Sequence, residues 1–389
     1  MSESVSRFDN IRPFRDEEVS AVLARVLADD ELMKVLIRFR LPWLPAWMHR
    51  VALPFVRAFL CYKTRSVRDV RSFQAVVEAY MQHAVSSTTT GLTVSGLEKI
   101  HRQQAYLYVS NHRDIAMDPA FMNWVLWHNG MDTVRIAIGD NLLSKPFVSD
   151  LMRLNKSFLV QRGETAPKKI YAALKQLSAY IHFSILEEKS SVWIAQREGR
   201  AKDGVDHTEE AIIKMFAMSK PKEQSLTDFV RELNIVPVSI SYEWDPCDVA
   251  KARELQQKTE LGSYQKEIHE DVQSIAAGIS GNKGRVHVSF GDVLQGEYAS
   301  TEEVVAEIDR QVRANYVHFP SNYLAAEALG WNTSGTYGFP PRPFDSNSVA
   351  VEKNLFQQRL AQCPDNCRSY WLAMYANPLR NTVKSNGDA

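Results

Sequence analysis

Apolar residues between about Asp16 and Ala84 recur at intervals of three and four positions. Val19, Leu23 and Val26 form one such set, and Val70 with Phe73 begins another. This spacing places apolar side chains on one face of a helix. It predicts that the first part of the chain is helical, up to a Ser/Thr cluster at residues 86–90.

A different pattern runs from about Gly91 to Val293, where short apolar runs alternate with helix-period segments. The alternation is typical of an α/β unit, in which helices cover a sheet. Helices are expected at residues 170–181 and 211–218. Strands are expected at residues 92–94, 105–109, 134–138, 158–161, 191–195, 235–241 and 285–290.

The third region opens with Thr301-Glu-Glu-Val, a plausible helix start, followed by Val304, Ile308 and Val312 on one face. After Gly335 the chain becomes rich in Pro, Gly, Asn and Ser, which favours irregular structure. We therefore expect a helical region at 1–90, an αβα domain with a mixed sheet at 91–300, and a helical extension with an irregular tail at 301–389.

Composition narrows the class of protein. The 389 residues carry 46 basic and 46 acidic side chains, with 45% hydrophobic residues, which fits a folded protein and argues against a nucleic-acid partner. Four scattered cysteines indicate a reducing, cytosol-facing location and neither a disulfide framework nor a zinc site. No signal-peptide pattern is seen at the N-terminus, and no apolar run reaches the roughly 18 residues that a spanning helix needs.

One stretch is strongly basic and rich in tryptophan. Between Lys34 and Arg71 there are nine Lys or Arg residues and a single acid, Asp69, interleaved with aromatic and aliphatic residues. Cations attract anionic headgroups, and Trp and Leu enter the headgroup–acyl boundary, so the pattern favours a membrane-surface element. The alternative is a helical layer packed on the core with a solvated basic rim. Three prolines are expected to break the stretch into short helices: Pro42, Pro45 and Pro54.

The candidate chemistry lies directly after the strand that ends near Val109. His112 follows this strand, and Asp114 and Asp118 lie in the turn toward the next helix. A histidine oriented by a carboxylate can deprotonate a hydroxyl and later return the proton to a leaving group. The same pair can also be a purely structural hydrogen bond, so other parts of the chain must decide.

Three further segments follow in order. Residues 157–163 form an aromatic and aliphatic strand that ends in Arg162-Gly163, and residues 192–200 form a strand that ends in Glu198-Gly199-Arg200. Residues 235–240 form an apolar strand interrupted by Pro237. With Ser110-Asn111-His112 and Asp118-Pro119, this makes four blocks in a fixed order.

The four blocks resemble those of the glycerolipid acyltransferase family, which comprises glycerol-3-phosphate, dihydroxyacetone-phosphate and lysophosphatidate acyltransferases. Residues 136–146 and 286–292 are also similar to segments of that family, and the likeness covers about residues 92–293. Two departures stand out. Five residues separate His112 from Asp118 where the family has four, so either the loop bulges or Asp114 is the partner of His112. In addition, a Thr is missing from the third block.

The resemblance implies roles for individual residues. His112 would be the general base, with Asp118 or Asp114 orienting its ring. In the substrate site, Glu198 would orient either the acceptor or the basic cluster, and Gly199 would permit a close backbone turn. A phosphate on the acceptor would be bound by Arg162 and Arg200, with Lys202 as a weaker candidate.

The expected protein is therefore an O-acyltransferase of phospholipid synthesis, peripheral on the cytoplasmic face of a membrane. It would move an acyl group from acyl-CoA or acyl carrier protein to a glycerol-3-phosphate or lysophosphatidate-type acceptor, with no metal or other cofactor. The alternative is a non-catalytic lipid-binding scaffold that keeps the fold. A protein kinase, a Gly-x-Ser-x-Gly hydrolase and a His-Glu-x-x-His metalloenzyme are excluded because their motifs are missing.

Overall fold

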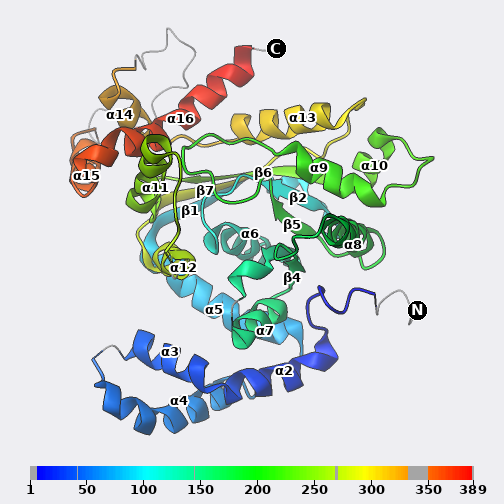
Figure 1. Ribbon diagram of the computed structural model, residues 1–389, viewed down its shortest axis with the longest axis vertical. Helices are drawn as coiled ribbons and strands as arrows, with labels where there is room; N and C mark the ends of the chain where they lie inside the picture. Colours follow the sequence, from blue (N-terminus) through cyan, green and yellow to red (C-terminus); the bar gives the residue numbers. More distant parts are fainter. Residues whose placement is uncertain (1–6, 42, 144, 268–269, 332–348, 388–389) are drawn as a thin grey trace. The chain divides into compact units, whose positions relative to one another are not determined.

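The computed structural model describes residues 7–41, 43–143, 145–267, 270–331 and 349–387 (Figure 1). The chain forms two compact units. The smaller contains Met1–Gln82 and Val134–Tyr180, and the larger contains His83–Thr133 and Ile181–Ala389. Helices α5 (Val70–Thr88) and α8 (Pro167–Leu186) each continue from one unit into the other. These units do not coincide with the expected boundaries after residues 90 and 300.

The smaller unit is built on a group of helices. They are α2 (Asp16–Ala28), α3 (Asp30–Arg40), the short 3₁₀ helix η1 (Ala46–Met48), α4 (His49–Lys63) and α7 (Pro146–Leu154). Strands β3 (Arg135–Gly139) and β4 (Ser157–Val160) pair in parallel in the same unit. The buried sides of α2 and α7 meet in one core that includes Val19, Val22 and Phe147, because these apolar positions recur at helical spacing.

The larger unit holds five strands in the order β1-β7-β6-β2-β5. Strand β6 is antiparallel to β7, and the remaining neighbours are parallel. Every residue of β6 is buried, as expected of a strand covered on both faces. The strands are β1 (Thr89–Ser95), β2 (Leu107–Ser110), β5 (Val192–Ala195), β6 (Ile235–Tyr242) and β7 (Gly284–Phe290).

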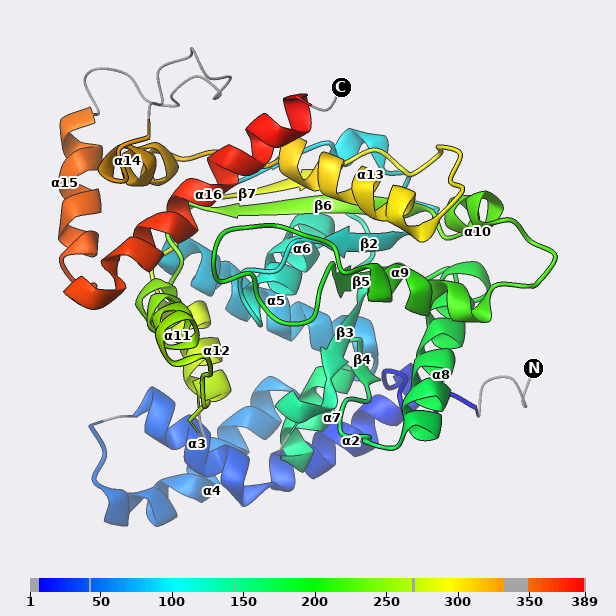
Figure 2. The same cartoon turned by 45° about the horizontal axis from the view of Figure 1, so that its top comes forward.

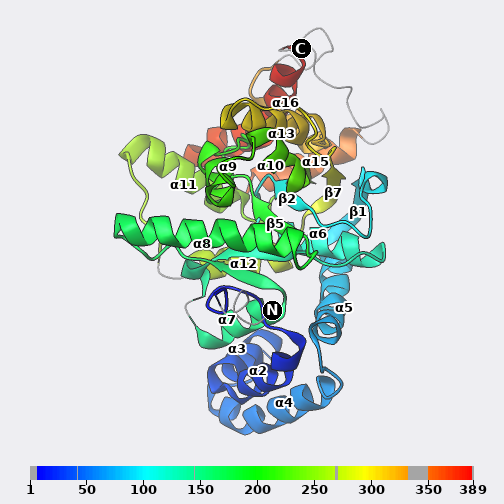
Figure 3. The same ribbon diagram turned by 90° about the vertical axis from the view of Figure 1, so that its right-hand side faces the viewer.

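Helices cover this sheet on both faces, so the expected α/β class with a mixed sheet is confirmed. Figure 2 shows α13 (Thr301–Ala314) lying along β6, and Figure 3 shows α16 (Arg368–Gly387) beside α13. The other helices of the unit are α6 (Met117–His128), α9 (Glu210–Phe216), α10 (Leu226–Glu232), α11 (Asp248–Leu261), α12 (Glu270–Ser280), α14 (Pro320–Ala328) and α15 (Val349–Leu360).

Two local expectations were wrong. The tail after Gly335 is not irregular throughout, because α15 and α16 are helices whose Phe356 and Trp371 are buried in the core of the larger unit.

Pro54 does not break the basic stretch, since α4 is one helix that contains it. A single proline removes one helical hydrogen bond, and packing of the flanking Leu53 and Val56 against the core compensates. Pro42 lies outside the described residues.

Candidate active site

His112 and Asp118 form a hydrogen-bonded pair between the end of β2 and the first turn of α6. The distance from His112 Nδ1 to Asp118 Oδ2 is 2.8 Å. This bond occupies Nδ1, which leaves Nε2 as the ring nitrogen that can accept a proton. The His112 side chain is 14% exposed, whereas that of Asp118 is 0% exposed. The imidazole is therefore accessible and its carboxylate partner is not.

Asp118 is held by three further donors. Its Oδ2 accepts the backbone N–H groups of Arg113 at 2.7 Å and Asp114 at 3.0 Å. Its Oδ1 accepts the hydroxyl of Tyr242 at 2.7 Å. Burial, together with the charge of Asp118, raises the pKa of Tyr242 well above 10, so the hydroxyl keeps its proton and stays a donor. These hydrogen bonds fix the orientation of the Asp118 carboxylate.

Asp114 has a different role. Its Oδ1 accepts the backbone N–H groups of Ala116 at 3.0 Å and Met117 at 2.8 Å, which caps the start of α6. Burial raises the pKa of Asp114, and the charge of Asp118 raises it further. Of the two carboxylates considered from the sequence, the partner of His112 is thus Asp118. The turn at residues 113–117 accommodates the extra residue by folding around the Asp118 carboxylate.

Two buried neighbours fix the turn that carries His112. Asn111 bonds both backbone groups of Ile240 on β6, donating to its carbonyl at 3.1 Å and accepting its N–H at 2.8 Å. Arg113 forms a buried ion pair with Asp206 at 2.7 Å, and the carbonyl of Arg113 accepts Lys251 Nζ at 2.6 Å. Breaking such a buried pair leaves an uncompensated charge, so the turn is held firmly.

A backbone hydrogen bond holds the residue after the third block next to His112. The N–H of Ala201 donates to the carbonyl of His112 at 2.8 Å. Two residues before Ala201, Gly199 has a φ of 73°, which glycine adopts without strain. An added Cβ at Gly199 would meet nothing within 4 Å. The Arg200 guanidinium approaches Ser274 Oγ on α12 at 3.4 Å. Glu198 is exposed, and its N–H donates to Glu209 at 3.2 Å.

Lys202 is placed less favourably for a phosphate. Its ammonium forms an ion pair with Glu254 on α11. Burial lowers the pKa of Lys202, and Glu254 opposes that shift. Because a carboxylate already compensates this charge, Lys202 is the weakest of the three predicted cations.

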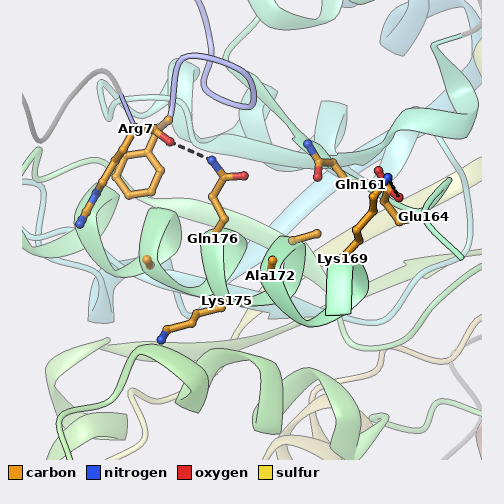
Figure 4. A pocket seen from close by; sticks show the side chains of 10 residues that line it. Arg7, Gln161, Glu164, Lys169, Ala172, Lys175 and Gln176 are labelled. Carbon is orange, nitrogen blue, oxygen red and sulfur yellow. Dashed lines mark hydrogen bonds and ion pairs between the residues drawn. The ribbon is translucent and has the colours of Figure 1, made fainter. Parts of the chain in front are cut away.

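Arg162 belongs to the smaller unit, where it follows β4. Its side chain is exposed, and its backbone N–H donates to Asp140 Oδ1 at 3.0 Å. The neighbouring residues Gln161 and Glu164 line a cavity of about 580 Å³ against α8. Figure 4 shows Lys169 reaching Glu164 and Gln176 reaching the carbonyl of Arg7 across this cavity. The predicted catalytic and phosphate-binding residues are not among those that line it.

Sequence reasoning missed two contacts of the pair. Tyr242 ends the fourth block and contacts Asp118, and Trp193 in β5 packs edge-on against the His112 ring at 5.9 Å. Both are aromatic residues in buried strands, a pattern that core packing alone explains, so only the spatial arrangement singles them out. In the part of the chain that the structure describes, His, Cys, Asp and Glu side chains form no group of three that could hold a metal ion.

Part of the chain is similar to a known protein family. The sequence profile of the family described as Acyltransferase matches residues 91–241. This segment is an acyltransferase domain. It contains the His112–Asp118 pair, Arg162, Arg200 and residues 235–241 of strand β6. We therefore describe the protein as an acyltransferase.

Among solved structures, the acyltransferase is similar to the 1-acyl-sn-glycerophosphate (LPA) acyltransferase PlsC from Thermotoga maritima. The two share 14% sequence identity with a TM-score of 0.39, and the match covers 73% of this chain and 93% of the other. A comparison with curated proteins found no match.

Proposed function

We propose that this acyltransferase moves a fatty acyl group from an acyl thioester to a hydroxyl of a phosphate-bearing glycerolipid acceptor. The observation that supports this best is the 2.8 Å bond between His112 Nδ1 and Asp118 Oδ2, with the ring accessible and the carboxylate buried. It is the arrangement that a general base requires, and it lies within the matched domain.

The proposed reaction needs a single base. His112 Nε2 takes the proton of the acceptor hydroxyl while the oxygen attacks the thioester carbonyl carbon. When the carbon–sulfur bond breaks, the imidazolium returns its proton to the departing thiolate, which leaves an oxygen ester and a free thiol. Asp118 stabilises the transient imidazolium through Nδ1. No acyl-enzyme is involved.

The phosphate of the acceptor is assigned to Arg200, which is joined to the His112 backbone through the adjacent Ala201. Arg162, the other arginine that the resemblance implies, follows β4 in the smaller unit. A planar guanidinium pairs two of its N–H groups with phosphate oxygens, which an ammonium cannot do. Glu198 and the glycine turn at Gly199 would border the acceptor.

The donor and the location follow from the same chemistry. Acyl-CoA and acyl carrier protein both present the required thioester, and we propose glycerol-3-phosphate or lysophosphatidate as the acceptor. A cytoplasmic place is consistent with four free cysteines.

The central test is acyl transfer by the purified protein. Labelled acyl-CoA or acyl carrier protein is offered with glycerol-3-phosphate or lysophosphatidate, and ester formation is measured. His112→Ala should reduce turnover by about 10²–10⁴-fold, since a positioned base contributes that much. His128→Ala, on the exposed end of α6, serves as the matched control and should leave turnover unchanged. Equal transfer by both variants, or lipid binding without any transfer, would refute the proposal and favour a scaffold.

The assignment of Arg200 has its own test. Arg200→Lys keeps the charge but loses the planar guanidinium that can donate two N–H groups to one phosphate. KM for the phosphorylated acceptor should therefore rise about tenfold or more, while kcat changes less. A phosphate-free acceptor such as monoacylglycerol should be used equally by the variant and the parent protein. If both acceptors are affected equally, Arg200 does not bind the phosphate.

A further inference from the structure

Six large apolar side chains between residues 43 and 62 are exposed on the smaller unit. Trp43 and Trp47 precede α4, and the other four lie within it at spacings of four, four and three residues. On a helix this spacing places side chains along one face. The members of this aromatic row and their exposed fractions are Trp43 74%, Trp47 74%, Val51 57%, Phe55 72%, Phe59 57% and Tyr62 59%.

The row is separate from the side of α4 that holds the fold together. Leu53, Val56 and Leu60 lie on the other face of the helix and pack against the core of the smaller unit. Helix α4 is therefore apolar on both faces, although only one face is covered. A helix with this pattern buries its second face against something else.

Charge indicates what covers the row. From Leu32 to Arg68 the chain has eight Lys or Arg residues and no Asp or Glu. Lys63 Nζ lies 5.7 Å from the centre of the Phe59 ring, and the Arg65 guanidinium lies 4.0 Å from that of Tyr62. Cations thus border the exposed rings directly, the arrangement that anionic headgroups above an acyl layer would match.

Two other occupants fit less well. A second copy packed through a two-fold axis would bring the same cations face to face, which is unfavourable. A spanning arrangement fails on length and polarity: α4, with 15 residues, is about 22 Å long against a hydrocarbon core of about 30 Å. Among the described residues, moreover, no helix is long and apolar enough to cross a membrane.

We propose that the aromatic row is a membrane-docking face on which α4 lies parallel to the surface of an anionic bilayer. The row enters the headgroup–acyl boundary, while Arg50, Lys63 and Arg65 contact the headgroups. The sequence suggested a membrane role for the whole basic stretch. The structure narrows it to these side chains and assigns Leu53, Val56 and Leu60 to the core.

The test is binding of the full-length protein to vesicles. Sedimentation with phosphatidylcholine vesicles, with and without phosphatidylglycerol, compares the parent protein with Phe55→Ser/Phe59→Ser. The variant should bind the anionic vesicles about tenfold or more weakly, because it lacks two of the rings that would enter the bilayer. The matched control is Leu261→Ser/Val351→Ser, which removes two apolar side chains that are 72% and 62% exposed elsewhere. It should bind like the parent.

Charge and self-association give the remaining outcomes. Lys63→Glu/Arg65→Glu should lose the preference for phosphatidylglycerol, and salt should weaken binding by the parent. The proposal would be overturned if Phe55→Ser/Phe59→Ser and Leu261→Ser/Val351→Ser bound equally well while circular dichroism showed both to be folded. It would also be overturned if light scattering showed the parent protein to be a dimer and only Phe55→Ser/Phe59→Ser to be a monomer. The assay does not measure acyl transfer, so its failure and that of the proposed reaction can be told apart.

Discussion

Tyr242 acts on His112 only through Asp118, to which it donates a hydrogen bond of 2.7 Å. Its hydroxyl draws negative charge away from the carboxylate that faces the imidazole. In Tyr242→Phe the carboxylate would hold the protonated ring more tightly. We expect kcat/KM to fall about 10–100-fold, corresponding to a lost bond to a charged group, and the acid limb of its pH profile to move to higher pH.

The shift in the pH profile of kcat/KM distinguishes loss of the Tyr242 hydrogen bond from simple damage to the core. Tyr108→Phe is the control, since Tyr108 is also a buried tyrosine of the sheet, packed on Phe290. It should leave the pH profile where it was. A profile that does not move in Tyr242→Phe would show that the hydroxyl is only structural.

At the scale of residues, the sequence singled out His112 as the candidate base but could not predict its surroundings. His112 and the two candidate carboxylates were identifiable because they follow a strand in a known block order. The choice between Asp114 and Asp118 was not, since it depends on which carboxylate the backbone of residues 113–117 surrounds. Likewise, the pairing of Lys202 with Glu254 joins residues 52 positions apart.

At the scale of elements, Gly278 determines how closely α12 approaches the turn before α6. A Cβ added there would lie 2.2 Å from Asp114 Oδ2. Alanine normally stabilises a helix relative to glycine, but here it would displace the carboxylate that caps α6. We expect Gly278→Ala to lower the free energy of unfolding by about 1–3 kcal/mol in chemical denaturation. Gly91→Ala, where an added Cβ meets nothing within 4 Å, should cost less.

Lys283 joins the ends of α5 and α12 to the start of β7. Its ammonium is fully buried and donates to neutral acceptors, the hydroxyl of Thr88 at 2.9 Å and the carbonyl of Gly281 at 2.8 Å. Burial lowers its pKa from 10.5 to about 8, against the opposing charge of Asp114. The folded protein therefore binds this proton less tightly than the unfolded chain does.

This shift has a definite sign in stability measurements. Between pH 8 and 10.5 the unfolded chain keeps the proton that the folded state releases, so this group makes the free energy of unfolding rise with pH. Relative to Lys283→Met, the parent protein should gain stability across that window, by at most about 1.4 kcal/mol per pH unit. Urea titrations at several pH values would measure the difference. A constant difference would mean that Lys283 titrates normally.

Most elements were predictable, because alternation and helical spacing are local. All seven expected strands are present, whereas their order is not local: β7 lies between β1 and β6. Helix α16 was missed because Pro378 and several Asn residues disfavour a helix. Burial of Trp371 and Leu379 in the core overrides that preference.

At the scale of the whole molecule, the expected C-terminal extension is part of the larger unit. Trp371 is fully buried and packs with Phe356 and Tyr375. From the same helix, Asn377 Nδ2 donates to the carbonyl of Asp203 at 2.7 Å, and Asn381 Nδ2 to that of Gly204 at 3.1 Å. Helix α16 thus contacts the loop that begins with Arg200 and Ala201.

These contacts predict that the far end of the chain affects both stability and acyl transfer. Trp371→Ala should lower the free energy of unfolding by about 3–5 kcal/mol, the usual cost of truncating a buried Trp. Asn377→Ala removes only the bond to Asp203, so it should cost about 1 kcal/mol yet raise KM for the phosphorylated acceptor, because the Arg200 loop loses a support. Glu327→Ala, on the last turn of α14, is the control for a polar truncation in the same region. If Asn377→Ala changes stability but leaves KM at the control value, α16 stabilises the unit without positioning the loop.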